Sequence, residues 1–103
     1  MNHDWYNRKA WTHKREVILR RDGYVCQLNK RYGKTVPAEV VHHIFPLEEF
    51  PEYGWESWNL ISVSKEMHNT LHDRTTNDLT DAGVELLKRT ARKNNIPIPA
   101  RYQ

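Results

Sequence analysis

Apolar positions near the start of the chain recur at helical spacing. Trp11 and Ile18 lie two helical turns apart with Lys and Arg between them, so the pattern predicts a helix over residues 5–21. Asp22 and Gly23 then supply a stop signal and a turn.

The middle of the chain changes to an extended pattern. Residues 36–45 are rich in β-branched and aromatic side chains and stop at Pro46, which predicts a strand. Residues 60–63 predict a second short strand. Before these two strands, we expect a short strand at residues 24–26, followed by a polar turn at residues 29–33.

A long loop is expected between the two main strands, over residues 47–58. It holds Gly54 and four glutamates, and its aromatic side chains are expected to anchor it to the body of the protein. Loops of this length in compact domains are often functional.

Two more helices are expected after the second strand. Ser64 is a candidate N-cap for a helix over residues 65–74, which would carry His68 and His72 on one stripe. A last helix is expected over residues 80–94, with a buried apolar stripe made by Val84, Leu87 and Ala91.

Composition limits the organisation of the chain. With 103 residues, we expect one domain, residues 1–103, with its core at residues 36–74, and the four Trp argue against disorder. No apolar run approaches the length of a membrane span, and no signal peptide is visible. The single Cys26 excludes an internal disulfide and fits a reducing compartment, so we expect a cytoplasmic protein.

Charge is distributed unevenly along the chain. Residues 1–36 carry a net charge of +6, residues 37–73 a net charge of −6, and residues 74–103 a net charge of +3. Basic flanks suit a polyanion such as nucleic acid. Taken alone, however, the charge pattern is better explained by solvated helix faces.

Four of the six histidines lie between residues 40 and 73. His68 and His72 are four apart, so a helix would place both rings on one face. His42 and His43 are neighbours in an expected strand, so they need not point the same way. Three imidazoles with an open fourth position are a recognised catalytic metal site, and His42, His68 and His72 could supply it. His43 would then be free to act as a general base.

Each histidine pair has an ordinary structural explanation when it is taken alone. The strand pair could be one core and one surface residue, and the helix pair could belong to a polar face. Asn59 alone could be a turn residue before a strand. The joint arrangement of these five residues is what favours a metal site.

Residues 17–74 resemble the HNH endonucleases, the ββα-metal or His-Me finger nucleases, of the small type common in phages and bacteria. The resemblance implies an α+β fold: a short antiparallel hairpin and a helix, flanked by an N-terminal and a C-terminal helix. It implies His43 as general base, Asn59 as a supporting residue and His68 as a metal ligand. The two histidine pairs are most similar to those of colicin-type DNases, in which three His hold one metal, and His42 would replace the Asp of many relatives.

The chain also departs from many relatives, which carry two pairs of cysteines around a structural zinc. Here Cys26 is alone, and Asn29 and Met67 stand at positions where those relatives have Cys. We therefore expect no second zinc site, and we expect packing to stabilise that region instead.

The resemblance implies a metal-dependent endonuclease that hydrolyses DNA and binds mainly backbone phosphates, with one divalent ion that could be Zn, Mg, Mn or Ni. Arg74 is a candidate phosphate contact, although a solvated cation at the C-terminal end of a helix explains it equally well. A phage terminase is a candidate partner, and the host-cell cytoplasm the expected location. Oligomeric state and nicking versus double-strand cleavage stay open. Two alternatives also stay open: a non-catalytic, metal-stabilised DNA-binding or packaging accessory protein, and an RNase of the same fold.

Overall fold

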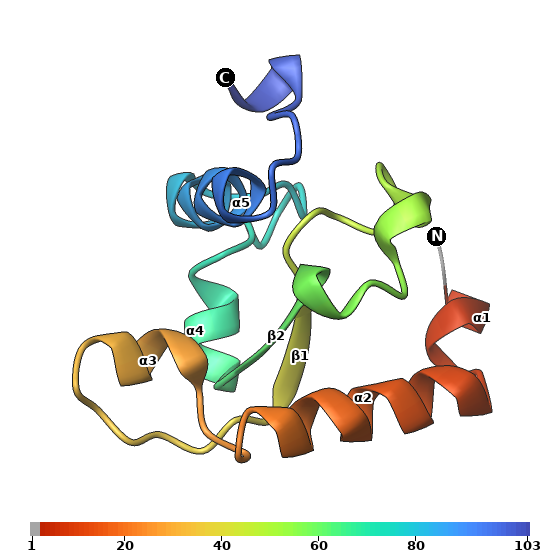
Figure 1. The fold of residues 1–103 in the computed structure, drawn as a ribbon, viewed down its shortest axis with the longest axis vertical. Helices are drawn as coiled ribbons and strands as arrows, with labels where there is room; N and C mark the ends of the chain where they lie inside the picture. Colours follow the sequence, from red (N-terminus) through yellow and green to blue (C-terminus); the bar gives the residue numbers. More distant parts are fainter. Residues whose placement is uncertain (1–2) are drawn as a thin grey trace.

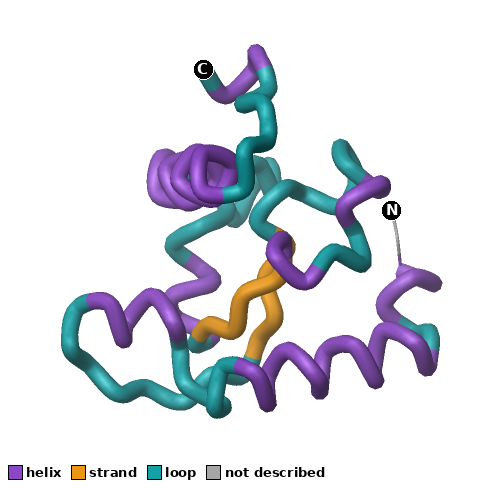
Figure 2. The backbone as a smooth tube through the Cα atoms, in the orientation of Figure 1, coloured by secondary structure: helices purple, strands orange, loops and turns teal. Residues whose placement is uncertain are grey.

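The computed structural model describes residues 3–103 and shows an α+β fold built around a two-stranded antiparallel hairpin. The strands are β1 (Val40–His43) and β2 (Leu60–Val63). Helix α2 (Lys9–Arg21) contacts the hairpin from one side, and α4 (Lys65–Asn69) contacts β1 from the other (Figures 1 and 2). The fold expected from the sequence, a hairpin and helix with flanking helices, is therefore confirmed.

The side-chain alternation of β1 divides the hairpin into two faces, both of them covered. The paired residues are Val40 with Val63, Val41 with Ser62, His42 with Ile61, and His43 with Leu60. Directly paired residues point to the same side of the sheet. His42 and Ile61 therefore face the larger hydrophobic cluster, beside α4, whereas His43 and Leu60 face the smaller cluster, beside α2. All four residues of β2 are buried as a result.

The helix expected over residues 5–21 is two helices, α1 (His3–Tyr6) and α2. The chain is extended at Arg8, which separates them. This break lets Trp5 fold back against Trp11, with ring centroids 4.7 Å apart. Tertiary packing of aromatic rings therefore overrides the continuous helix that the periodicity predicted.

The strand expected at residues 24–26 and the turn expected at residues 29–33 are replaced by an isolated bridge, Val25 with Pro37, and by helix α3 (Gln27–Arg31). Gln27 stabilises this region, because its Nε2 donates to the carbonyl oxygens of both Asp22 and Val25.

Strand β1 is shorter than the predicted residues 36–45, because the backbone beyond it is hydrogen-bonded to Asn59 instead of to a strand. The amide of Ile44 donates to the Asn59 carbonyl at 2.9 Å, and the amide of Phe45 donates to its side-chain Oδ1 at 2.6 Å. The loop that follows contains two 3₁₀ turns, Pro51–Tyr53 and Ser57–Asn59.

The outer edge of β2 is covered by the end of α2. Asp22 accepts a hydrogen bond from the Ser62 amide at 3.0 Å, and Arg21 donates to the Leu60 carbonyl at 2.7 Å. Burial would raise the pKa of the Asp22 carboxyl, but its hydrogen bonds with Arg21 and Ser62 lower that pKa overall. A two-stranded sheet with an open edge would be marginal, so these contacts stabilise the hairpin.

Helix α4 ends at Asn69 and not at residue 74 as predicted. Ser64 caps its start as expected, accepting from the Met67 amide at 3.1 Å. After Asn69 the chain turns, and His72 forms an isolated bridge with Leu79. His68 and His72 therefore do not share one helix.

Helix α5 (Asp81–Lys93) lies close to the predicted residues 80–94 and buries Gly83, Leu86, Leu87 and Ala91. Thr80 caps it, and the Thr80 amide donates to the Leu71 carbonyl at 3.0 Å. The start of α5 is thus fixed against the residue that precedes His72. Among the described residues, no helix is long and apolar enough to cross a membrane.

Replacing Gly83 by Ala tests this close approach. A Cβ at Gly83 would collide with the Leu71 carbonyl oxygen, which is backbone and cannot move aside cheaply. Overpacking costs about 1–3 kcal/mol, and the helix propensity gained from Ala offsets roughly 1 kcal/mol of it. Gly83→Ala should therefore lower the free energy of unfolding in urea titrations. Glu85→Ala, at an exposed position of the same helix, is the matched control, and a more stable Gly83→Ala protein would contradict the packing described here.

Candidate metal centre

His42 is the buried member of a group of three histidines. It is 1% exposed, because it lies on the inner face of β1 beneath α4. Burial lowers the pKa of the His42 imidazole well below its usual value, and the nearby rings of His72, His68 and His43 lower it further. The ring is therefore neutral at pH 7, which is the form that binds a metal ion.

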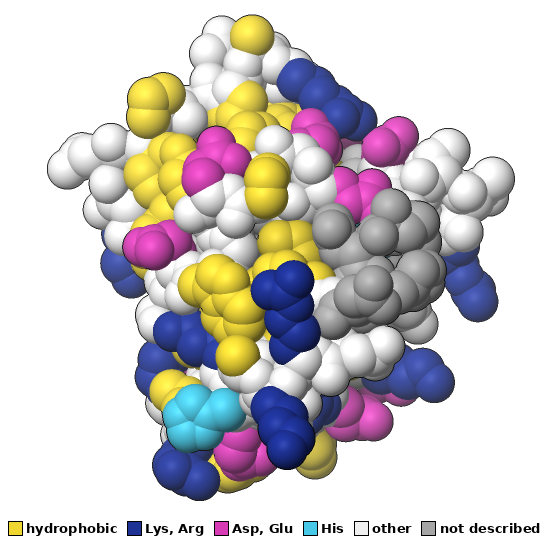
Figure 3. All heavy atoms as spheres, turned by 90° about the vertical axis from the view of Figure 1, so that its right-hand side faces the viewer, with side chains coloured by type: hydrophobic (Ala, Val, Ile, Leu, Met, Phe, Trp, Pro, Cys, Tyr) yellow, Lys and Arg dark blue, Asp and Glu magenta, His cyan; other side chains and the backbone are white. Residues whose placement is uncertain are grey.

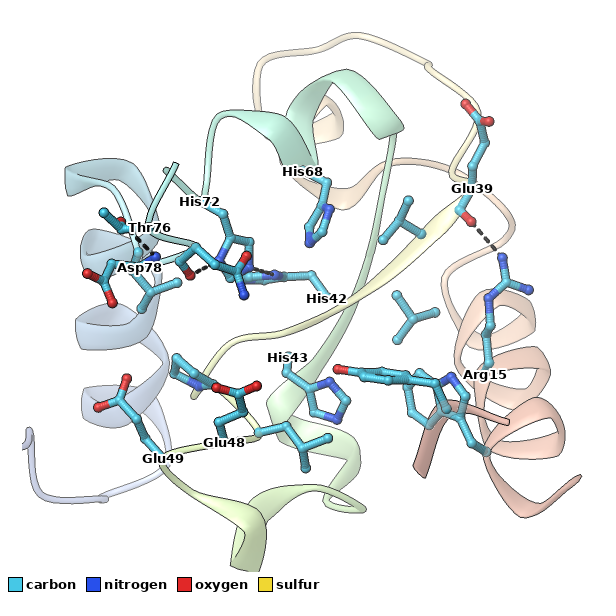
Figure 4. Close-up of a pocket in the computed structure, with 18 of the residues that line it drawn as sticks. Arg15, Glu39, His42, His43, Glu48, Glu49, His68, His72, Thr76 and Asp78 are labelled. Carbon is cyan, nitrogen blue, oxygen red and sulfur yellow. Dashed lines mark hydrogen bonds between the residues drawn. The ribbon is translucent and has the colours of Figure 1, made fainter. Parts of the chain in front are cut away.

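The rings of His42, His68 and His72 converge from two elements and a turn (Figure 4). One ring nitrogen from each lies within 4.8 Å of the other two. His42 Nδ1 and His72 Nε2 are 3.3 Å apart. An ion with metal–nitrogen bonds of about 2.0–2.1 Å holds two tetrahedral ligands about 3.3–3.4 Å apart, so this spacing suits a bound ion.

The orientation of His72 is fixed by a backbone carbonyl. Its Nδ1 lies 3.2 Å from the oxygen of Asn77, and because a carbonyl can only accept, Nδ1 carries the proton. Nε2 then presents its lone pair toward His42. Outer hydrogen bonds of this kind are typical of metal-binding histidines.

The second nitrogen of His42 is not the one that faces His72. His42 Nε2 is buried and has no hydrogen-bond partner among the residues that the structure describes. The pKa of His68 is lowered by burial and by the neighbouring His72. Three imidazoles with converging ring nitrogens are a donor set that suits a divalent ion.

His43 points to the opposite side of β1, into the aromatic cluster beneath α2. Its ring is 6% exposed and stacks on Trp11, with centroids 5.2 Å apart and an interplanar angle of 22°. Its Nε2 donates to the Gly54 carbonyl oxygen at 3.1 Å, which leaves Nδ1 as the free acceptor. Burial lowers the pKa of His43, and the hydrogen bond to Gly54 partly opposes that shift.

Gly54 is a site residue that the sequence did not single out. A Cβ there would lie 2.8 Å from Leu47 Cδ1 and 3.3 Å from Trp5 Cζ2, so a larger residue would displace these side chains. Its carbonyl oxygen is the hydrogen-bond partner of His43. A lone glycine in an acidic loop is the only sequence signal for this role, and it is a weak one.

Asn59 is fully buried and ties the loop to the hairpin. Its Nδ2 donates to the carbonyl oxygens of Phe45 at 3.2 Å and Tyr53 at 3.1 Å. Tyr53 directly precedes Gly54, so Asn59 holds the segment that orients His43. The side chain of Asn59 makes no hydrogen bond to His43 itself.

Both sets of histidines line one cleft of about 620 Å³ (Figure 4). Arg15 lies at one end, and Glu49 and Asp78 lie at the other, where Arg101 pairs with both carboxylates at 2.7 and 3.1 Å. Arg74 is exposed and does not line the cleft. The structure therefore brings His42, His43, His68 and His72 to one cavity, with Asn59 behind it and Arg74 outside.

Charge around the cleft is mixed and not uniformly basic. Glu39, Glu48, Glu49 and Asp78 line it together with Arg15 and Arg101. On the face of the molecule shown in Figure 3, basic, acidic and hydrophobic side chains are likewise interspersed. The basic flanks seen in the sequence therefore do not gather into one basic patch on that face.

Comparison with solved structures finds a relative of this chain. No family model matches the sequence, and no curated protein matches it. The structure is similar to that of the HNH endonuclease of the deep-sea thermophilic bacteriophage GVE2, solved with a manganese ion, with a TM-score of 0.63 and 30% sequence identity. The match covers 64% of this chain and 72% of the phage protein. With this identity over most of that relative, and with three histidines converging beside the hairpin, the chain belongs to the HNH endonuclease family.

Proposed function

We propose that this protein is a metal-dependent endonuclease that hydrolyses phosphodiester bonds in DNA. The proposal rests on how β1 distributes the four histidines between its two faces. Three imidazoles converge on one face, and a fourth is held on the other, yet all four open into the same cleft. The phage HNH endonuclease, to which the structure is similar, supports the same reaction class.

The three-histidine group would hold the metal. His42, buried in β1, would be the fixed ligand, while His68 and His72 would complete the set from α4 and the turn that follows. When bound there, a divalent ion would act as a Lewis acid on a phosphate oxygen and on the departing oxygen. The manganese ion of the phage relative agrees with a divalent ion, and zinc, magnesium and nickel remain alternatives.

His43 would be the general base. Its Nδ1 would take a proton from the attacking water, while its Nε2–H stays bonded to the Gly54 carbonyl. Because the ring is buried and its pKa is lowered, it is neutral and able to accept a proton at pH 7. Trp11 and Asn59 would act as positioning residues, Trp11 through its stack on His43 and Asn59 through the loop that carries Gly54.

DNA would be held mainly through its phosphates. Contacts of this kind position a site without reading the base sequence. Arg15, which lines the cleft, is better placed for such a contact than Arg74, which is exposed outside it. Arg74 would contact a phosphate at the periphery of the site, because it follows His72 by two residues.

The competing proposal is a metal site that only stabilises the fold. A substitution at His43 distinguishes the two proposals, because a structural metal site does not need this residue. Replacing His43 by Gln should leave metal binding intact and lower supercoiled-plasmid nicking in manganese by a factor on the order of 10²–10⁴, the usual worth of a general base. His13→Ala, at an exposed histidine outside the cleft, is the control and should nick normally. A His43→Gln protein that binds metal and nicks like wild type would remove His43 as the base. The same assay on single-stranded RNA tests for RNase activity.

Metal binding should be visible without any reaction. A ligand that binds only the folded state stabilises it by about 2.7 kcal/mol at one hundred times its dissociation constant. Manganese or zinc should therefore raise the melting temperature of the wild type, and a chelator should reverse the rise. His72→Ala should lose this response, whereas His13→Ala should keep it. An undiminished response in His72→Ala would exclude His72 as a ligand.

A further inference from the structure

Tyr6 is an exposed aromatic residue in the wall of the cleft that the proposed chemistry does not use. Its side chain is 46% exposed, although it lines the same cavity as His43. Leaving a large aromatic ring half in water gives up part of the free energy that its burial would yield. In a cleft, such a ring is available to a ligand.

The ring of Tyr6 is held at its place without being covered. It makes edge contacts with Trp5, Trp11 and His43, at centroid distances of 5.4, 5.7 and 6.0 Å. All three contacts are T-shaped, with interplanar angles of 72°, 81° and 73°. Among the described residues, no ring stacks parallel to Tyr6. The edge contacts therefore fix the position of the ring and leave its face available to a ligand.

A cation lines the same cleft. Arg15 is half-buried and donates from Nη2 to the Glu39 carbonyl oxygen at 2.6 Å (Figure 4). A guanidinium has five N–H donors, so this one bond fixes the group and leaves donors for an anion. Tyr6 and Arg15 thus offer an aromatic face and a positive charge to the cleft that His43 also lines.

An aromatic face beside a cation is the chemistry that binds single-stranded nucleic acid. Bases stack on the ring while phosphates meet the charge. In a double helix each base face is covered by its neighbours, so this contact needs an unstacked base. The cleft volume of about 620 Å³ lies within the range of small-ligand pockets, about 300–1,000 Å³, which suits single nucleotides.

We propose that Tyr6 stacks on an unpaired base of the substrate while Arg15 binds its backbone, so that the cleft prefers single-stranded or locally unpaired nucleic acid. This inference rests on the proposed function, because it places the base beside the phosphate that His43 and the three-histidine group would address. The competing explanation is that Tyr6 only packs against His43 as a lid. A lid would have no preference for strands that carry bases.

Binding to two strands with the same phosphates tests the inference. Fluorescein-labelled oligothymidylate of eight nucleotides is compared with an abasic strand of equal length, by anisotropy, in chelator so that nothing is cut. The wild type should bind the thymidylate strand roughly 5- to 150-fold more tightly, the worth of one base–aromatic stack. Tyr6→Phe should keep this ratio, and Tyr6→Ala should bind both strands equally. Arg15→Gln should weaken both strands alike.

Tyr32→Ala serves as the matched control, because Tyr32 is 78% exposed and does not line the cleft. It should bind both strands as the wild type does. A Tyr6→Ala protein that keeps the preference for bases overturns the inference, as does a wild type that shows no preference or binds neither strand.

A plasmid-nicking assay in manganese shows whether a failure concerns the role of Tyr6 or the proposed nuclease function. If the wild type nicks DNA and Tyr6→Ala keeps the base preference, only the role of Tyr6 fails. If the base preference depends on Tyr6 but the wild type cuts no DNA, the nuclease proposal fails and the binding site stands.

Discussion

The side-chain alternation of one four-residue strand determines the arrangement of the site. His42 and His43 are adjacent in β1, so the strand turns one ring toward α4 and the other toward α2. Pairing with β2 prevents a slip in register, because both faces of the hairpin are buried and a shift by one residue would exchange them. The separation of the three-histidine group from the fourth histidine is therefore built into the strand.

Each set of histidines depends on a backbone carbonyl from a loop. Asn77 orients His72, and Gly54 orients His43. The first loop is closed by the bridge between His72 and Leu79, and the second is held by the Asn59 side chain. The aromatic cluster completes the second arrangement, because Trp11 stacks on His43 from α2. The small domain thus uses side-chain amides and aromatic rings where a larger protein could rely on a deeper core.

Some of this architecture could be predicted from the sequence. The resemblance to HNH endonucleases predicted the α+β fold, and the positions of His42, His68 and His72 predicted a group of three histidines, which the structure brings together. The reason given for one pair was wrong: His68 and His72 were expected on a single helix, but α4 ends at Asn69 and a turn brings the rings together. The role of these three rings as metal ligands, like the roles of His43, Asn59 and Arg74, stays a prediction.

Other features could not be predicted, because they depend on contacts between residues far apart in the sequence. The break between α1 and α2 follows from the packing of Trp5 and Trp11, which no local propensity reports. Gly54 and Asn77 act through carbonyl oxygens, and every residue has one, so sequence alone does not single them out. Tyr6 matters through its exposure in the cleft, which is a property of the fold.

Anomalous scattering from a crystal grown with manganese tests the central claim most directly. The account predicts one strong peak between the rings of His42, His68 and His72, bonded to a nitrogen of each, with His43 close by and not bonded to the ion. A peak elsewhere, or three rings turned away from one another around an empty centre, would contradict it.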